Sequence, residues 1–324
     1  MNRFILPVLS LFMLSLLAGG GLLAWGYLQF TKPGPTIAET TVVIAQGAGI
    51  KVIAETLGQA GVIADPLIFR LGVRLSRMDK ALKAGEFVFP YGVSAKGAAI
   101  VLKTGKTVVR RLTIAEGLTS VQVFEQLVAA EGLEQSFDVP LEGSVLPETY
   151  HYSYGDSRAE LVQRMVKAMD NGLIRLWNER AEGLPFRGPA EALILASIVE
   201  KETGLKAERA RIAGVFINRL RLGMRLQSDP TVVYGLSEGE GPLGRALTRA
   251  DLKTDNPYNT YLIKGLPPGP ICNPGLAAIK AVFNPEATDE LYFVADGNGG
   301  HTFAKTLKQH NRNVAKWRKI RDGG

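Results

Sequence analysis

The chain has 324 residues, of which 46% are hydrophobic and 21% charged, a globular composition with room for two modest domains. Its net charge of +7 is compatible with nucleic-acid binding, but the basic residues are scattered. They form no RNP signature, zinc finger or arginine-rich arm, so we expect no nucleic-acid partner. The single cysteine, Cys272, excludes an internal disulfide and a cysteine-based zinc site, and the histidines lie too far apart for a short metal motif. We therefore expect neither a metal nor a cofactor.

The first segment is long and apolar enough to cross a membrane. No charged residue lies between Phe4 and Thr31, and roughly 20 apolar residues span a bilayer as a helix. A cleaved signal peptide is the alternative, but its apolar centre is shorter, and Trp25 and Tyr27 suit the aromatic belt of a retained anchor. We predict a transmembrane anchor over residues 1–31 with a short cytoplasmic N-terminus, so that the rest of the chain lies outside the cytoplasm.

Residues 38–114 contain short elements of both kinds. Strands are predicted at 40–44, 83–89 and 106–114, and helices at 50–57, from Pro66 onward, and from a Ser94 cap to Leu102. These elements predict a small α+β module that follows a short proline-containing linker.

One predicted helix, which begins at Pro189 and ends just before Gly204, carries two acidic residues near its carboxyl end. At about 100° per residue, Glu202 lies on the apolar stripe of Leu195 and Ile198, whereas Glu200 falls nearly opposite and is expected to be the more solvent-exposed. Burial and the negative end of the helix dipole both raise the pKa of the Glu202 carboxyl. A carboxyl group that keeps its proton near neutrality is what protonation of a glycosidic oxygen requires.

A structural role for Glu202 is the alternative. The carboxylate would then form an ion pair with a nearby arginine such as Arg209 or Arg211. The residues of this helix taken alone do not decide between the two roles.

The motifs around and after this helix give the chain its strongest resemblance. They share a fixed order along the second half of the chain and lie at 196–203, 215–220, 224–232, 258–261, 265–271 and 292–303. In this order they resemble the YceG-like family of endolytic murein transglycosylases, the MltG type. The resemblance implies that Glu202, the second glutamate of the Glu-Lys-Glu-Thr motif, is the catalytic acid and base.

The resemblance also implies an architecture and a location. The fold class is expected to be α+β, with a transmembrane helix, a LysM-like module at 38–114 and a YceG-like catalytic domain at 115–324. The LysM-like module would either bind glycan or only space the catalytic domain from the membrane. A basic helix over 307–321 is expected to pack back through Val314 and Trp317. The implied location is the bacterial inner membrane, with the catalytic domain in the periplasm.

Five further residues are expected to bind substrate. They combine amide, aromatic and imidazole groups in polar loops, and they are Gln227, Tyr258, Asn259, Tyr261 and His301. A structural role is the alternative for His301, as it is for most isolated histidines. The neighbouring Asp229 precedes a proline and is instead predicted to cap a helix.

The implied reaction cuts the β-1,4 bond between N-acetylmuramic acid and N-acetylglucosamine within nascent peptidoglycan strands. It leaves 1,6-anhydro ends and terminates strand elongation. The implied partners are peptidoglycan glycan strands and penicillin-binding peptidoglycan synthases. Two alternatives are a hydrolytic muramidase that uses the same acid with water, and a non-enzymatic peptidoglycan-binding scaffold.

Overall fold

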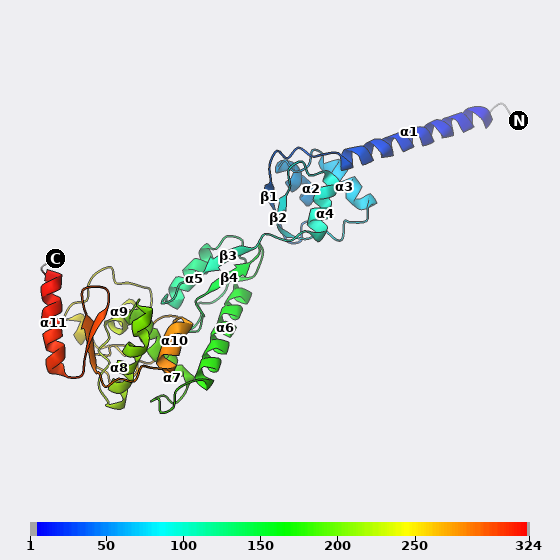
Figure 1. Cartoon of the computed structure of the whole chain (residues 1–324). Coiled ribbons are helices and arrows are strands. Elements are labelled where there is room, and N and C mark those ends of the chain that lie inside the picture. Colours follow the sequence, from blue (N-terminus) through cyan, green and yellow to red (C-terminus); the bar gives the residue numbers. More distant parts are fainter. Residues whose placement is uncertain (1–4, 323–324) are drawn as a thin grey trace. The chain divides into compact units, whose positions relative to one another are not determined.

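The computed structural model describes residues 5–322, so the predicted short cytoplasmic N-terminus lies outside the described residues. The chain divides into two compact units (Figure 1). The first comprises the residues up to Arg110 with 131–133 and 151–156, and the second comprises 111–130, 134–150 and the residues from Ser157 onward. Helices and strands occur in both units, which confirms a mixed α and β fold.

Helix α1 (Ile5–Thr31) is the predicted anchor. Its segment Leu9–Thr31 has a mean hydropathy of 1.7, and within residues 5–322 it is the one helix long and apolar enough to cross a membrane. Nearly all of its described side chains are exposed, and Phe30 alone among them is fully buried. An apolar surface of this size is unfavourable in water, so α1 is a candidate single-pass anchor.

The first unit contains a two-stranded sheet and three short helices. Strand β1 (Thr40–Ile44) pairs antiparallel with β2 (Gly85–Phe89), and Val42 lies opposite Phe87. The helices are α2 (Ile50–Gln59), α3 (Pro66–Leu75) and α4 (Ala95–Thr104). The Ser94 hydroxyl caps α4 as predicted. The first unit therefore combines helices and strands, as predicted, whereas the bounds 38–114 and the LysM character of the module stay predictions.

The second unit is mainly helical. Its helices are α5 (Ser120–Ala129), α6 (Arg158–Asn178), α7 (Pro189–Glu202), α8 (Arg209–Arg221), α9 (Asp229–Ser237), α10 (Leu276–Phe283) and α11 (Leu307–Asp322). Strand β3 (Arg110–Thr113), shorter than predicted, pairs with β4 (Thr149–Tyr152), and β5 (Tyr292–Ala295) pairs antiparallel with β6 (His301–Ala304).

Helix α7 contacts four other helices of this unit. It packs against α6, α8, α9 and α10, and Leu195, Ile198 and Val199 are fully buried in the shared core. The predicted apolar stripe is therefore confirmed. The core fixes the rotation of α7, and with it the direction of the residues at its carboxyl end.

Candidate active site

Glu202 is the last residue of α7 and is half-buried. The pKa of its carboxyl is raised to about 7, chiefly by burial and in smaller part by the negative charge of Asp229. The hydrogen bond from Ser228 and the charges of His301 and Arg219 lower the pKa of Glu202. The group is therefore poised to give and take a proton near neutral pH.

Ser228 holds the Glu202 side chain. Its Oγ donates a hydrogen bond of 2.5 Å to Glu202 Oε1, and its backbone N–H donates to Thr260 Oγ1 at 3.0 Å. Thr231 Oγ1 in turn donates to the carbonyl of Ser228. This role could not be predicted from the sequence, because no helical or strand period links positions 202 and 228.

Glu202 opens into a cavity of about 590 Å³ in the second unit. The cavity combines polar and aromatic groups, as sites for sugars do. Three of the five predicted substrate-binding residues line it together with Glu202, namely Gln227, Tyr261 and His301. Asp229, for which no substrate contact was predicted, also lines it. The other lining residues are Arg219, Leu226, Tyr292, Phe293, Val294, Ala295, Leu307, His310, Asn311 and Trp317.

Gln227 has an uncommon backbone conformation, with φ of +52°. Its backbone N–H donates to the carbonyl of Thr260 at 3.1 Å, so the same loop that positions Ser228 also holds Gln227. Left-handed backbone in a non-glycine residue costs free energy and is concentrated at functional sites. The placement of Gln227 therefore fits its predicted substrate contact.

The predicted capping role of Asp229 is wrong. Ser228 is the N-cap residue of α9, and Asp229 is already helical with no side-chain capping bond. Its Oδ1 instead accepts a hydrogen bond of 2.5 Å from the Tyr261 hydroxyl. Asp229 and Tyr261 thus form a pair in the wall of the cavity that Glu202 also lines.

His301 is oriented by a carboxylate. Its Nδ1 lies 2.7 Å from Glu208 Oε2, and its backbone N–H donates to Glu208 Oε1 at 3.0 Å. A partner on Nδ1 fixes the orientation of the ring, so that Nε2 points away from Glu208. The ring also contacts Phe293 edge-on. His301 lines the Glu202 cavity, as expected for a site residue.

Tyr258 and Asn259 do not line this cavity. Asn259 is buried, and its Nδ2 donates to the carbonyls of Leu252 and Thr254. Tyr258 packs its ring against Tyr234, with ring centroids 4.8 Å apart. Both residues support the loop behind the cavity, and their predicted substrate contacts stay untested.

The two arginines named as alternative partners of Glu202 are engaged elsewhere. Arg209 pairs with Glu200 at 2.8 Å, and Arg211 forms a bidentate pair with Glu290. The expectation that Glu200 is solvent-exposed is wrong, because its side chain is 5% exposed and its other oxygen accepts from the Gly275 N–H. Glu200 connects α7 to α8 and to the start of α10. Of the two carboxyl groups at this end of α7, Glu202 is therefore the one that lines the cavity.

Arg219 is a second residue that the sequence analysis missed. It is buried, and its guanidinium donates to the backbone carbonyls of Leu291 and Leu226, each at 2.6 Å. It therefore holds the segment before Gln227 against β5. Among the described residues, no group of three or more His, Cys, Asp and Glu side chains is arranged to hold a metal ion.

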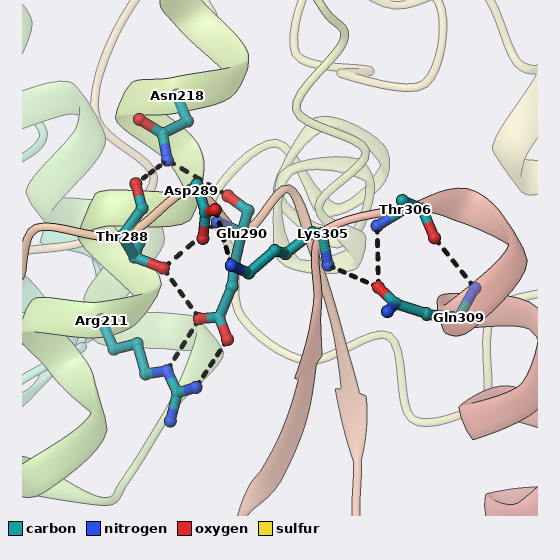
Figure 2. Close-up of polar contacts among 8 residues, drawn as sticks. All are labelled: Arg211, Asn218, Thr288, Asp289, Glu290, Lys305, Thr306 and Gln309. Atoms are coloured by element: carbon teal, nitrogen blue, oxygen red, sulfur yellow. Dashed lines mark hydrogen bonds and ion pairs between the residues drawn. The ribbon is translucent and has the colours of Figure 1, made fainter.

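A polar network connects α8 to the segment before β5, and another group of contacts joins the end of β6 to α11 (Figure 2). Asn218 Nδ2 donates to the carbonyl of Thr288 at 2.7 Å, and Glu290 accepts from Arg211. Directly after β6, Lys305 pairs with Asp289 at 2.7 Å. Gln309 then accepts from the Lys305 and Thr306 N–H groups and so fixes the start of α11. The hairpin and α11 are thus held in place as a cavity wall.

The comparisons with known proteins agree with this geometry. Residues 42–316 match the YceG-like family. The chain belongs to the YceG-like family. Two curated relatives are named endolytic murein transglycosylase. The one from Bacillus subtilis is 37% identical over 60% of this chain, and the one from Streptococcus pneumoniae is 31% identical over 94%. The chain spans 52% and 63% of the lengths of these two relatives.

A solved structure of a YceG-like protein from Listeria monocytogenes is also similar. It is 32% identical, with a TM-score of 0.56 over 85% of this chain and 98% of that chain. The similarity therefore extends over both units of this YceG-like chain.

The contacts of Glu202 in this YceG-like site predict opposite shifts of its pKa in two variants. Ser228→Ala removes a hydrogen bond that favours the charged form, so the pKa of Glu202 rises. Asp229→Asn removes a negative charge, so the pKa falls. If protonated Glu202 drives strand cleavage, the alkaline limb of the pH–rate profile moves to higher pH in the first variant and to lower pH in the second. Limbs that move together, or not at all, would contradict the assignment.

Proposed function

We propose that this chain is an endolytic lytic transglycosylase that cuts the bond between N-acetylmuramic acid and N-acetylglucosamine in nascent peptidoglycan strands. The observation that carries the proposal is Glu202, whose carboxyl has a pKa of about 7 and lines a polar, aromatic cavity. The names of the curated relatives, endolytic murein transglycosylase, support the same activity.

The proposed mechanism uses Glu202 twice. The protonated carboxyl donates its proton to the bridging oxygen as the glycosidic bond breaks, and the substrate's own acetamido group stabilises the oxocarbenium-like centre. The carboxylate then takes the proton from the 6-hydroxyl of the muramic acid, whose oxygen closes on the anomeric carbon. No water is consumed, and the product end is a 1,6-anhydro sugar.

A second cavity supports internal cutting. It has a volume of about 650 Å³ and adjoins the Glu202 cavity at Asp229, which lines both. Its walls include Lys201, Tyr234 and Arg245, and it belongs to the same unit. A binding region that continues past the acid on one side accommodates sugars beyond the cleaved bond, as an enzyme that cuts within a strand requires.

A hydrolytic muramidase is the second candidate, and the position of Asp229 favours it. Asp229 lines the same cavity as Glu202 and is close enough to raise the pKa of its carboxyl. Glycoside hydrolases usually have two catalytic carboxyl groups that flank the cleaved bond. The Tyr261 hydroxyl donates a hydrogen bond to Asp229 Oδ1, so one of the two oxygens of this carboxyl is already used within the cavity wall, which counts against this role.

The cellular setting is part of the proposal. Helix α1 would anchor the chain in the bacterial inner membrane with its N-terminus in the cytoplasm and both units in the periplasm. There the enzyme would meet strands as penicillin-binding synthases release them, with the first unit either binding glycan or acting as a spacer. The apolar surface of α1 supports the anchor.

Product masses test the activity. The full chain in detergent is incubated with purified glycan strands of defined length. Transglycosylation leaves the summed mass of the fragments equal to that of the strand, whereas hydrolysis adds one water for each cut. Fragments with added water would replace the proposal by the muramidase. Strands that bind to the folded chain without being cut would replace it by the scaffold.

A further inference from the structure

Helix α3 presents an apolar stripe to its surroundings. Leu67, Leu71 and Leu75 are spaced four residues apart, and they are 55%, 48% and 73% exposed. The opposite side of the same helix buries Phe69 and Val73 in the core of the first unit. A helix that is apolar on both sides needs a second apolar environment besides the core.

Helix α1 lies directly beside this stripe. The Phe30 ring packs on Gly72, where an added Cβ would lie 2.4 Å from the ring. A cavity of about 190 Å³ next to this contact is lined by Trp25 and Tyr27 of α1 and by Leu71 and Leu75 of α3. The stripe is therefore continuous with the apolar surface of α1.

The contact also sets the depth of α3 along the anchor. Trp and Tyr concentrate where a membrane helix meets the headgroups, and Trp25 and Tyr27 mark that level on α1. Because α3 contacts α1 at this level, it lies at the boundary between headgroups and acyl chains when α1 spans a bilayer.

The charges of α3 suit the same boundary. At about 100° per residue, Arg70 and Arg74 flank the leucine stripe on the side away from Gly72, and Arg77 follows the helix. The helix itself contains no acidic residue. Arginine side chains at this depth reach lipid phosphates, while the apolar groups beside them enter the acyl region.

We propose that α3 is an interfacial helix that seats the first unit on the membrane. Its stripe of Leu67, Leu71 and Leu75 occupies the acyl boundary, and Arg70 and Arg74 bind the phosphates of phospholipids. This inference rests on the anchor role proposed for α1. Its consequence is that the first unit is held against the bilayer and does not move freely at the end of a tether.

Depth-dependent quenching tests the proposal in the full chain reconstituted into phospholipid vesicles. Leu75→Cys is labelled with an environment-sensitive fluorophore, and the vesicles carry a nitroxide at a shallow position of the acyl chain. The native Cys272 is fully buried, so the unaltered chain measures background labelling. We expect quenching at position 75 to exceed that at the control by about twofold or more, since an interfacial helix buries its apolar face roughly 5–10 Å deep.

Val88→Cys is the matched control. Val88 is 40% exposed on β2, which Figure 1 shows apart from α1. Equal quenching at positions 75 and 88 in chains that stay with the vesicles would overturn the interfacial helix and leave the anchor intact. Chains that wash off the vesicles would overturn the anchor itself. Energy transfer between labels at position 75 of two chains, without nitroxide quenching, would assign the stripe to a second copy instead.

Discussion

Glu202→Gln lowers the rate of strand cleavage by about 10²–10⁴-fold, because the amide has the size of the carboxyl but cannot give or take the proton. The amide oxygen of the variant can still accept the hydrogen bond from Ser228, so we expect the variant to fold. The measurement is the initial rate at which new strand ends form at neutral pH, with strand binding measured in parallel.

Glu191→Gln is the control for this prediction. It makes the same chemical change in the first turn of the same helix, where Glu191 accepts from the Arg187 N–H and lies outside the cavity. Its cleavage rate should match that of the unaltered chain. A Glu202→Gln variant that keeps its rate would remove Glu202 from the mechanism.

Arg209→Met destabilises the second unit by about 3–5 kcal/mol, because it leaves the Glu200 carboxylate buried without its partner. The side chains of Arg209 and Glu200 are 7% and 5% exposed, and they connect α7 to α8. Adding Glu200→Gln to this variant should restore part of the loss, since the remaining charge is removed. Urea unfolding followed by the fluorescence of the tryptophans in the second unit gives the free energies.

Arg187→Met is the matched control for stability. Arg187 also pairs with a glutamate, Glu191, but its side chain is 94% exposed. Exposed pairs contribute about 0–1 kcal/mol, so the loss should be small. Equal losses in the Arg187 and Arg209 variants would contradict the structural role assigned to the buried pair.

Helix α7 shows what the sequence could predict. Its start, its buried stripe and the direction of Glu202 follow from local rules of helix termini and periodicity. The structure confirms the start and the stripe, and it ends the helix at Glu202, one residue earlier than predicted. The same local rules failed for Glu200. Its partners are Arg209 on α8 and the N–H of Gly275 before α10, and a helical wheel contains no information on either.

The remainder of the site depends on contacts between distant segments. Ser228 reaches Glu202 across 26 positions, and Tyr261 reaches Asp229 across 32. The proline after Asp229 correctly indicated a helix start. Ser228 is nevertheless the N-cap residue, and its backbone N–H is held by Thr260, a contact that the local sequence does not indicate. Asn259 lies in a recognisable motif, yet its amide is used entirely within the loop.

Cleavage in water enriched in oxygen-18 tests the central claim most directly. The unaltered chain and Glu202→Gln are incubated in parallel with purified strands, and the new ends are identified by mass spectrometry. We expect 1,6-anhydro ends without the heavy isotope from the unaltered chain and no new ends from the variant. Reducing ends that carry one oxygen-18, or anhydro ends formed equally by the variant, would contradict it.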